Sequence, residues 1–363
     1  MSSSGLVKIE GEFPLALGGS LPEIEIRYEE WGDLTAPADR TVVIMPALSA
    51  SCHVRSNDDD PSPGWWEEMV GPGLGVDTDR WRVVAASILG APFGSTSPMT
   101  SNPNTGRPWG RDFPQITPAD QARCHALLLD HLGLDRVHAV VGASLGGMQA
   151  LQFAAQFPDR IGRLVSISAT GKTTPATVAL RRVGRLAIMN DPDYADGHYE
   201  PGKLPERGLA VARELGMICY RSRDEFNQRF DWDPDPEGPY TAGSLTYEVE
   251  RYLNHHGTRF ANVFDANCYL LLSRCMDLMD LGAGFRSYAE GVLRITCPCF
   301  IVGVDRDILI PPSEQQHLAH LLESHGRDVS FEILPSLFGH DAFLKEYDWF
   351  GTRIRTWLGD DVD

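Results

Sequence analysis

A short stretch around residue 144 constrains the fold of this chain more than any other feature. A valine-rich run, residues 137–141, breaks into Gly142-Ala143-Ser144-Leu145-Gly146 and then into an alanine-rich helical pattern over residues 145–157. G-x-S-x-G between a strand and a helix is typical of a nucleophile elbow, a turn so tight that only very small residues fit two positions before and after the serine. We predict that the serine is strained and that its Oγ is exposed above a sheet. The free N–H groups of the helix N-terminus would there favour a developing negative charge.

A serine nucleophile needs a base and an orienting acid, which follow it in the order acid, then histidine. Of the 11 histidines, His340 fits best, because it follows the strand-like run 329–334 and precedes an apolar helical pattern over residues 343–358. We expect four other histidines on solvated helix faces: His125, His131, His317 and His320. The sequence therefore predicts His340 as the general base.

The acid is expected after the buried-strand run 299–304, which opens into Asp305-Arg306-Asp307. Two carboxylates compete there, and both lie between the serine and the histidine in the required order. We favour Asp307, because the apolar residues 308–310 and a proline follow it, so that its side chain should point back into the fold. Asp305 is the alternative.

Composition excludes several classes of protein. A chain of 363 residues with 42% hydrophobic residues can bury a large core, and its net charge of −18 disfavours nucleic-acid or anionic-membrane partners. The first 17 residues contain no apolar signal region and no window approaches a membrane span, so we expect a cytoplasmic protein. Seven cysteines without a C-x-x-C pair indicate neither a disulfide framework nor a metal site.

Strand and helix patterns alternate at both ends of the chain. Strand-like runs are residues 24–28, 41–45, 81–87, 136–141, 163–168, 299–304 and 329–334. Thr117-Pro118-Ala119-Asp120 supplies an N-cap, a proline at the first helical position and an acidic first turn, and this helix is expected to stop at Gly133. The alternation predicts an α/β fold with a mostly parallel, doubly wound sheet covered by helices on both faces.

The middle of the chain loses its strand patterns. Helical patterns are residues 176–189, 204–220, 247–256 and 267–281, with a loop rich in Pro, Asp and Gly over residues 231–243. We predict a core formed by residues 1–170 and 292–363, and a helical lid formed by residues 171–291. Such an insertion would cover the carboxyl edge of the sheet above Ser144 and exclude water.

Motifs along nearly the whole chain resemble those of one family. They are Tyr28-Glu29-Glu30-Trp31-Gly32, Pro63-Gly64-Trp65-Trp66-Glu67, Gly71-Pro72-Gly73, Asp77-Thr78-Asp79-Arg80-Trp81, Gly94-Ser95-Thr96, Asn102-Pro103-Asn104-Thr105-Gly106, Asp112-Phe113-Pro114, residues 142–150, residues 183–189, Phe264-Asp265-Ala266-Asn267 and Gly339-His340-Asp341. Together they resemble the homoserine O-acetyltransferase family, whose members have the α/β-hydrolase fold and include serine O-acyltransferases.

The resemblance implies ping-pong acyl transfer from an acyl-CoA, acetyl-CoA or succinyl-CoA, to an amino-acid hydroxyl, as in methionine and cysteine biosynthesis. Ser144 would carry the acyl group, with His340 as base and Asp307 as its partner. The oxyanion would be bound by the N–H groups of Leu145 and Leu48, although Leu48 could equally be an ordinary core residue.

The same resemblance implies that Arg185 holds the carboxylate of the acceptor and Asp341 its ammonium group. The alternative for Arg185 is a solvated helix arginine. The resemblance further implies a homodimer formed through the lid helices and no tightly bound cofactor.

Departures from the family pattern leave the substrates open. Residues 46–53 and 56–61 look more like the relatives that acylate serine, whereas Val183-Gly184-Arg185 is closer to the homoserine enzymes. A succinyl donor would need one cation, for which Arg181, Arg182 and Arg221 are candidates. We favour transfer of an acetyl group to L-homoserine. L-serine O-acetylation or O-succinylation, and a serine esterase in which water takes the acyl group, are the alternatives.

Overall fold

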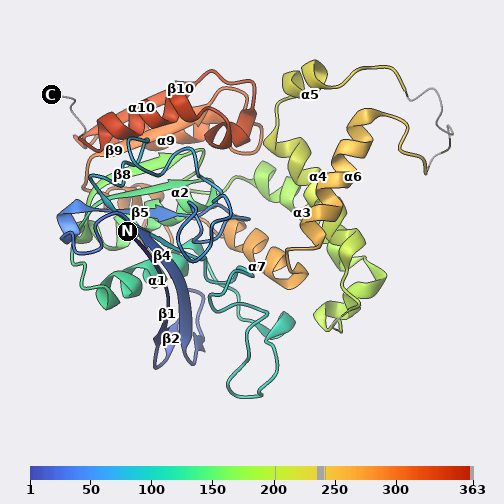
Figure 1. Cartoon of the computed structure of the whole chain (residues 1–363), viewed down its shortest axis with the longest axis horizontal. Coiled ribbons are helices and arrows are strands. Elements are labelled where there is room, and N and C mark those ends of the chain that lie inside the picture. The colour runs from blue at the N-terminus through green and yellow to red at the C-terminus, as the bar shows by residue number, and fades with distance from the viewer. Residues whose placement is uncertain (201, 235–240, 242, 360–363) are drawn as a thin grey trace.

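The computed structural model describes residues 1–200, 202–234, 241 and 243–359, and these contain the expected mostly parallel sheet (Figure 1). Among the described residues, eight strands pair in the order β1-β4-β6-β5-β7-β8-β9-β10. The six strands from β6 to β10 in this order are parallel, while β4 runs antiparallel to β6 and to β1. The strands are β1 (Ser2–Ile9), β4 (Ile24–Trp31), β6 (Arg82–Ala86), β5 (Thr41–Met45), β7 (Val137–Ala143), β8 (Ile161–Ile167), β9 (Cys299–Val304) and β10 (Val329–Leu334), and β2 (Phe13–Pro14) and β3 (Ser20–Leu21) form a separate hairpin.

Helices cover both faces of the sheet. One face packs against α1 (Pro118–His131), α2 (Leu145–Gln156) and α9 (Pro312–Glu323), and the other packs against α10 (Tyr347–Trp357) and the segment around Trp66. Along β5 the side chains alternate between two cores, with Val43 and Met45 in the first and Val42 and Ile44 in the second. Burial on both faces explains why these strands are continuous apolar runs, as expected for a doubly wound sheet.

The start of α1 has the cap that its sequence predicts. The Thr117 side chain accepts a hydrogen bond from the Asp120 amide, and Asp120 Oδ2 accepts one from the Thr117 amide at 2.7 Å. Pro118 is the first helical residue, and the helix ends at His131, just before Gly133 with φ 68°. Local sequence therefore determines both ends of this helix.

The prediction that His125 lies on a solvated helix face is wrong. This side chain is buried, because α2 packs over that face of α1, and its Nε2 lies 3.0 Å from Gln149 Oε1. Burial lowers the pKa of His125 to about 4, so the imidazole is neutral. The sequence pattern missed this because it does not tell which helix covers α1.

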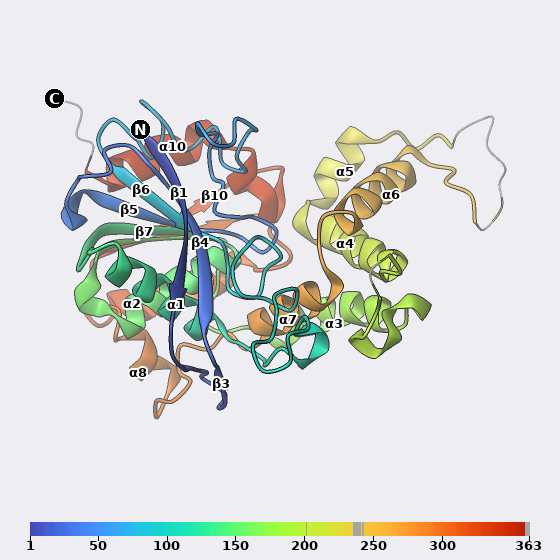
Figure 2. The ribbon, with the colours of Figure 1, turned by 60° about the horizontal axis from the view of Figure 1, so that its bottom comes forward.

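In the sequence, six helices follow β8 and precede β9 among the described residues. They are α3 (Pro175–Met189), α4 (Glu206–Tyr220), α5 (Arg223–Arg229), α6 (Glu248–Ala261), α7 (Ala266–Asp277) and α8 (Tyr288–Val292). Figures 1 and 2 show α3 to α6 beside the sheet layers, with α7 between this group and the core. The described residues of 171–291 contain no strand beyond an isolated bridge between Lys172 and Asp280. Most of the loop expected at residues 231–243 lies outside the described residues.

The first strand was not predicted from sequence. β1 pairs with β4 at the edge of the sheet and is only partly buried, so it lacks the apolar run that marks the inner strands. The short 3₁₀ helices are η1 (Ala38–Arg40), η2 (Gly110–Asp112), η3 (Pro158–Arg160), η4 (Pro192–Gly197) and η5 (Gly339–Leu344). Within the described residues, none of the helices combines the length and the apolar composition that a membrane span requires.

Candidate active site

Ser144 occupies the sharp turn between β7 and α2. Its φ of 55° and ψ of −121° are strained for a serine. A Cβ on Gly142 would lie 2.2 Å from the Gly146 carbonyl oxygen, and a Cβ on Gly146 would lie 1.9 Å from that of Met45. The turn therefore requires glycine at both positions, as the sequence predicts. The serine is only 8% exposed, not open at the surface, because it lines a cavity with residues of the lid.

Two loops bring a histidine and an aspartate to Ser144. His340 lies in η5, after β10, and Asp307 follows β9. Ser144 Oγ lies 2.9 Å from His340 Nε2, and His340 Nδ1 lies 2.6 Å from Asp307 Oδ2. With Nδ1 protonated and donating to the carboxylate, Nε2 is free to accept the hydroxyl proton. The three side chains form the hydrogen-bonded chain that a serine nucleophile needs.

The structure distinguishes the two candidate carboxylates. Asp307 is 3% exposed, and its Oδ1 accepts hydrogen bonds from the amides of Leu309 (2.9 Å) and Ile310 (2.8 Å). Asp305 is exposed and accepts from the Ser336 amide at 3.0 Å. After Asp307, Ile308 is exposed while Leu309 and Ile310 are buried. Of the two carboxylates, Asp307 is the one that contacts His340.

The surroundings of His340 favour its charged form. Burial of the ring is the largest single influence and opposes the charge, but the charge and hydrogen bond of Asp307 together with the charge of Asp341 outweigh it, so the pKa of His340 is raised above its ordinary value of 6.5. Arg181 reduces this increase. The imidazole is therefore a stronger base than a free histidine.

Two backbone amide groups are candidates for an oxyanion-binding site. Leu145 is the first residue of α2, and Leu48 lies in the loop after β5 and lines the same cavity as Ser144. The structure gives neither amide a hydrogen-bond acceptor among the described residues. Free N–H groups beside a nucleophile can bind the oxygen of a tetrahedral intermediate. The Leu48 side chain is only 7% exposed, so it also forms part of the core.

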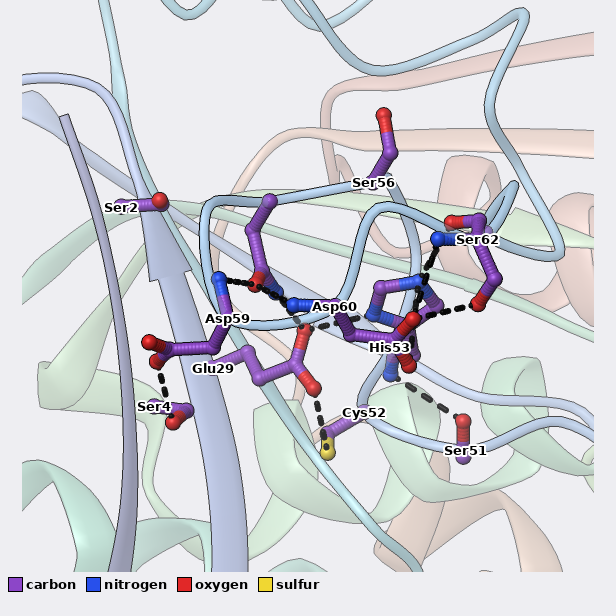
Figure 3. Close-up of polar contacts among 12 residues, drawn as sticks. Ser2, Ser4, Glu29, Ser51, Cys52, His53, Ser56, Asp59, Asp60 and Ser62 are labelled. Atoms are coloured by element: carbon purple, nitrogen blue, oxygen red, sulfur yellow. Dashed lines mark hydrogen bonds and ion pairs between the residues drawn. The ribbon is translucent and has the colours of Figure 1, made fainter.

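A buried carboxylate anchors the loop that carries Leu48 (Figure 3). Glu29 on β4 is 5% exposed, and its Oε2 accepts from His53 Nδ1 at 2.9 Å and from Asn57 Nδ2 at 2.7 Å. His53 Nε2 lies 2.8 Å from the Ser62 carbonyl oxygen, so both ring nitrogens face acceptors. Burial opposes a charge on His53, but these hydrogen bonds raise its pKa. The Glu29–His53 pair thus fixes the chain soon after Leu48.

Ser144 and His340 line a cavity of about 100 Å³. The other walls come from the loop after β5 that carries Leu48 (the oxyanion loop), the lid helices α3, α4 and α7, the loop after β9, and η5. The residues that line them are Ala47, Leu48, Ser49, Leu180, Arg181, Gly184, Ala212, Arg213, Leu215, Gly216, Cys219, Tyr220, Tyr269, Ser273, Met276, Leu309, Asp341, Phe343 and Leu344. The Tyr220 ring lies 5.8 Å from the ring of His340. The wall is mostly apolar, with a few charged groups that can orient a small polar ligand.

The structure does not bring Arg185 to this cavity. Its Nη2 lies 2.6 Å from Asp277 Oδ2, and its Nη1 donates to Ser273 Oγ at 2.8 Å, so α7 holds the guanidinium away from the reacting groups. At 3% exposed it is not a solvated arginine either, and it lines a separate groove that does not include Ser144. Arg181, one helical turn earlier, lines the cavity instead.

Asp341 does line the cavity, next to His340 in the chain. Its Oδ2 lies 3.0 Å from Arg221 Nε. Burial raises the pKa of Asp341, and the charges of Arg221, His340 and Arg213 oppose the increase. The carboxylate is placed where an ammonium group in the cavity could reach it. The sequence analysis did not identify Arg213 or Tyr220, because the helical pattern of α4 does not tell which of its faces lines the cavity.

The described part of the chain shows no group of three or more histidine, cysteine or acidic side chains arranged to hold a metal ion. The seven cysteines are free and buried.

Comparisons with known proteins identify the fold and the family of the chain. Residues 40–347 match the model of the alpha/beta hydrolase fold family. The chain is 41% identical to a serine O-succinyltransferase of Litchfieldella anticariensis over 97% of both chains. It is 42% identical to a homoserine O-acetyltransferase of Symbiobacterium thermophilum over 96% of this chain and 92% of the relative. The crystal structure of esterase E22 superimposes with a TM-score of 0.90 at 25% identity, covering 99% of this chain and all of that one.

The backbone contact at the elbow can be tested by replacing Gly146 with alanine. The added Cβ would lie 1.9 Å from the Met45 carbonyl oxygen, so we expect a loss of about 2–3 kcal/mol in the free energy of unfolding, measured by urea denaturation. Gly243→Ala is the matched control, because a Cβ there meets nothing within 4 Å. Equal stability of the two variants would contradict the requirement for glycine.

The assignment of the acid can be tested with two aspartate variants. Asp307→Asn should lower the rate of p-nitrophenyl acetate hydrolysis by on the order of 10⁴-fold, because the amide favours the wrong histidine tautomer. Asp305→Asn should leave the rate near that of the wild type, since the Asp305 side chain accepts from the Ser336 amide and does not contact His340 in the described part of the chain. The reverse pattern would make Asp305 the partner of His340.

The pKa of His340 should be visible in the pH profile. Only the neutral imidazole can accept the Ser144 proton, so kcat/KM should fall as the pH falls through the pKa of the free enzyme. Because that pKa is raised, we expect the midpoint of this acidic limb above pH 6.5. In Asp307→Asn any residual activity should show a lower midpoint. A wild-type midpoint at or below 6.5 would argue against the dominant influence of Asp307.

Proposed function

Since the chain belongs to the homoserine O-acetyltransferase family of α/β-hydrolase-fold O-acyltransferases, we propose that it transfers an acyl group from an acyl-CoA to an amino-acid side-chain hydroxyl. The observation that carries this proposal is the hydrogen-bonded chain from Ser144 through His340 to Asp307 at the wall of a lid-covered cavity. The reaction has two half-reactions that use the same three side chains.

In the first half-reaction, Ser144 Oγ attacks the thioester carbonyl while His340 Nε2 takes its proton. The oxyanion of the tetrahedral intermediate would accept hydrogen bonds from the Leu145 and Leu48 amides. As the carbon–sulfur bond breaks, the imidazolium returns the proton to the CoA sulfur. The product is an ester on Ser144, and CoA leaves.

In the second half-reaction, the acceptor hydroxyl takes the place of the thiol. His340 removes its proton, the oxygen attacks the ester carbonyl, and the proton then passes to Ser144 Oγ as the ester bond breaks. We assign Asp341 as the partner of the acceptor ammonium group. Arg213 and Arg181 are the cations of the cavity wall that can bind carboxylates, whereas Arg185 is held by Asp277 and Ser273.

Two substrate pairs deserve testing. L-homoserine with acetyl-CoA is the pair favoured by the family motifs, and L-serine with succinyl-CoA is the second. The relatives named for these two reactions are about equally similar, at 42% and 41% identity. One methylene in the acceptor changes binding by only about 1–3 kcal/mol, so small differences in the cavity wall decide between homoserine and serine.

A serine esterase is the second candidate function, and the likeness to esterase E22 favours it. Water would then replace the amino acid in the second half-reaction. The lid favours acyl transfer over hydrolysis, because it leaves Ser144 only 8% exposed and limits the access of water to the ester.

We also propose a homodimer that forms through the lid. Large apolar side chains are exposed on α3, on α4 and just after α6: Val183 (56%), Val211 (52%), Ile218 (46%) and Val263 (65%). A second copy of the same surface would bury them.

Partitioning of the acyl group tests transfer against hydrolysis. The protein is incubated with acetyl-CoA or succinyl-CoA, with and without L-homoserine or L-serine, and thiol release is measured. We expect an acyl adduct on Ser144 by mass spectrometry, and several-fold faster thiol release when the right amino acid is present. Ser144→Ala should show neither. Thiol release at the full rate without an amino acid would support the esterase and contradict the transferase.

A further inference from the structure

A second space in the molecule is separate from the cavity of Ser144. It is a groove of about 540 Å³, which is within the size range of small-molecule sites. Helices α3 and α7 form walls of both spaces, but no described residue lines both. The two spaces lie back to back where Arg185, which lines the groove, donates to Ser273, which lines the cavity, at 2.8 Å. The groove is therefore a distinct candidate site.

The charged side chains of this groove are all positive. No acidic side chain is among its described lining residues, and its four arginines are Arg111 on η2, Arg182 and Arg185 on α3, and Arg274 on α7. Arg111 is paired with Asp196, whose side chain is 83% exposed, so water weakens this pair. Arg182 is exposed and takes part in no ion pair within the described parts of the chain. In a chain with a net charge of −18, this local excess of positive charge favours an anionic ligand.

Arg185 is the most buried of the four arginines, at 3% exposed, and it shares its counter-charge. Its Nη2 lies 2.6 Å from Asp277 Oδ2, and Arg274 Nη1 lies 3.5 Å from the same oxygen. Arg181 contacts the other oxygen of Asp277 at 3.2 Å, so one carboxylate faces three guanidinium groups. Burial, the largest influence, lowers the pKa of Arg185, and although the Asp277 charge opposes this, the Arg274 charge adds to it. A second negative charge beside Arg185 would stabilise the cluster.

Arg185 also has an unused donor. Its Nε is buried and has no hydrogen-bond partner among the described residues, which is costly unless a ligand supplies an acceptor. Guanidinium groups from three elements line the groove around it, which suits a ligand with several charged oxygens, as in a phosphate or diphosphate, better than a single carboxylate. Much of the remaining wall is apolar, and Met189, Tyr194 and Leu270 can contact an organic group.

We propose that this groove binds a phosphate-bearing organic anion of the nucleoside diphosphate class, at a site separate from the one where the acyl group is transferred. The phosphates accept from Arg185 Nε and from the guanidinium groups of Arg182 and Arg274, and the organic part lies on the apolar wall. The acyl donor of the proposed reaction also carries phosphates, but its thioester has to lie at Ser144, on the other side of the contact between Arg185 and Ser273. The ligand of the groove is therefore a second, independent molecule.

Direct binding is the first test. ADP and inorganic diphosphate are titrated into the full chain by isothermal titration calorimetry at low ionic strength, with adenosine as the uncharged comparison. We expect one ADP per chain, bound at least about 10-fold more tightly than adenosine, because the phosphates make the charge-assisted hydrogen bonds. Added salt should weaken ADP binding, since three of the four arginines are exposed at the rim. If neither ADP nor diphosphate binds, or if adenosine binds as tightly as ADP, the proposal is wrong.

The double variant Arg182→Gln/Arg274→Gln locates the binding site. Both side chains are exposed, so the fold should tolerate the change, and the Kd of ADP should rise by on the order of 10- to 100-fold. Arg294→Gln is the matched control, because Arg294 is an exposed arginine that does not line the groove, and its Kd should equal that of the wild type. ADP should also raise the Tm of the wild type and the control but not that of the double variant. Equal ADP affinity in the double variant and the wild type would place the ligand elsewhere and overturn the proposal.

Competition with CoA separates this site from that of the acyl donor. ADP is titrated into Ser144→Ala, which cannot transfer acyl groups, with and without saturating CoA. Unchanged ADP affinity supports a separate site. Displacement of ADP by CoA would mean that the groove holds the phosphates of the donor itself, which would overturn the inference and leave acyl transfer intact. If instead no acyl-CoA forms an adduct on Ser144 in the wild type, the proposed function fails, while ADP binding that depends on Arg182 and Arg274 still supports the site.

Discussion

The site depends on one backbone contact, between the end of β5 and the first turn of α2. Gly146 approaches Met45 so closely that a Cβ could not be placed between them. The same contact positions Pro46, where the oxyanion loop begins, and Gln149 Nε2 strengthens it by donating to the Pro46 carbonyl at 3.3 Å. Neutral His125 holds that amide from behind. The nucleophile and both candidate oxyanion amides are thus fixed relative to each other by main-chain packing, and Glu29 and His53 secure the far end of the loop.

Sequence patterns were sufficient for the sheet apart from its edge strand β1, for the elbow and for the three reacting side chains, because each depends on local order. Strand-like runs, a glycine-spaced serine, and an aspartate and a histidine in the loops after two later strands are all visible in the printed sequence. The sequence favoured Asp307 over Asp305 without excluding Asp305, because of the apolar residues that follow Asp307; of these, Leu309 and Ile310 are buried and Ile308 is exposed. Parallel strands then bring these loops together at one edge of the sheet.

Contacts between helices could not be predicted in the same way. Arg181 and Arg185 are four residues apart on α3, so helical periodicity places them on nearly the same face and cannot tell which one meets the cavity. The position of α7 decides, because Asp277 and Ser273 hold Arg185 away from the cavity. Asp277 also contacts Arg181 at 3.2 Å, but Arg181 still lines the cavity that contains Ser144. His125 was misplaced for the same reason, since its burial depends on α2 and not on its own helix.

Charge links the lid to the chemistry. A chain with a net charge of −18 gains nothing from long-range attraction of an anionic acyl-CoA, so the attraction has to be local. Burying guanidinium groups achieves this, because electrostatic interactions strengthen away from water, but the desolvation has to be offset by a counter-charge. Asp277 supplies one negative charge to arginines on α3 and on its own helix, which joins the two lid helices yet leaves them positively charged.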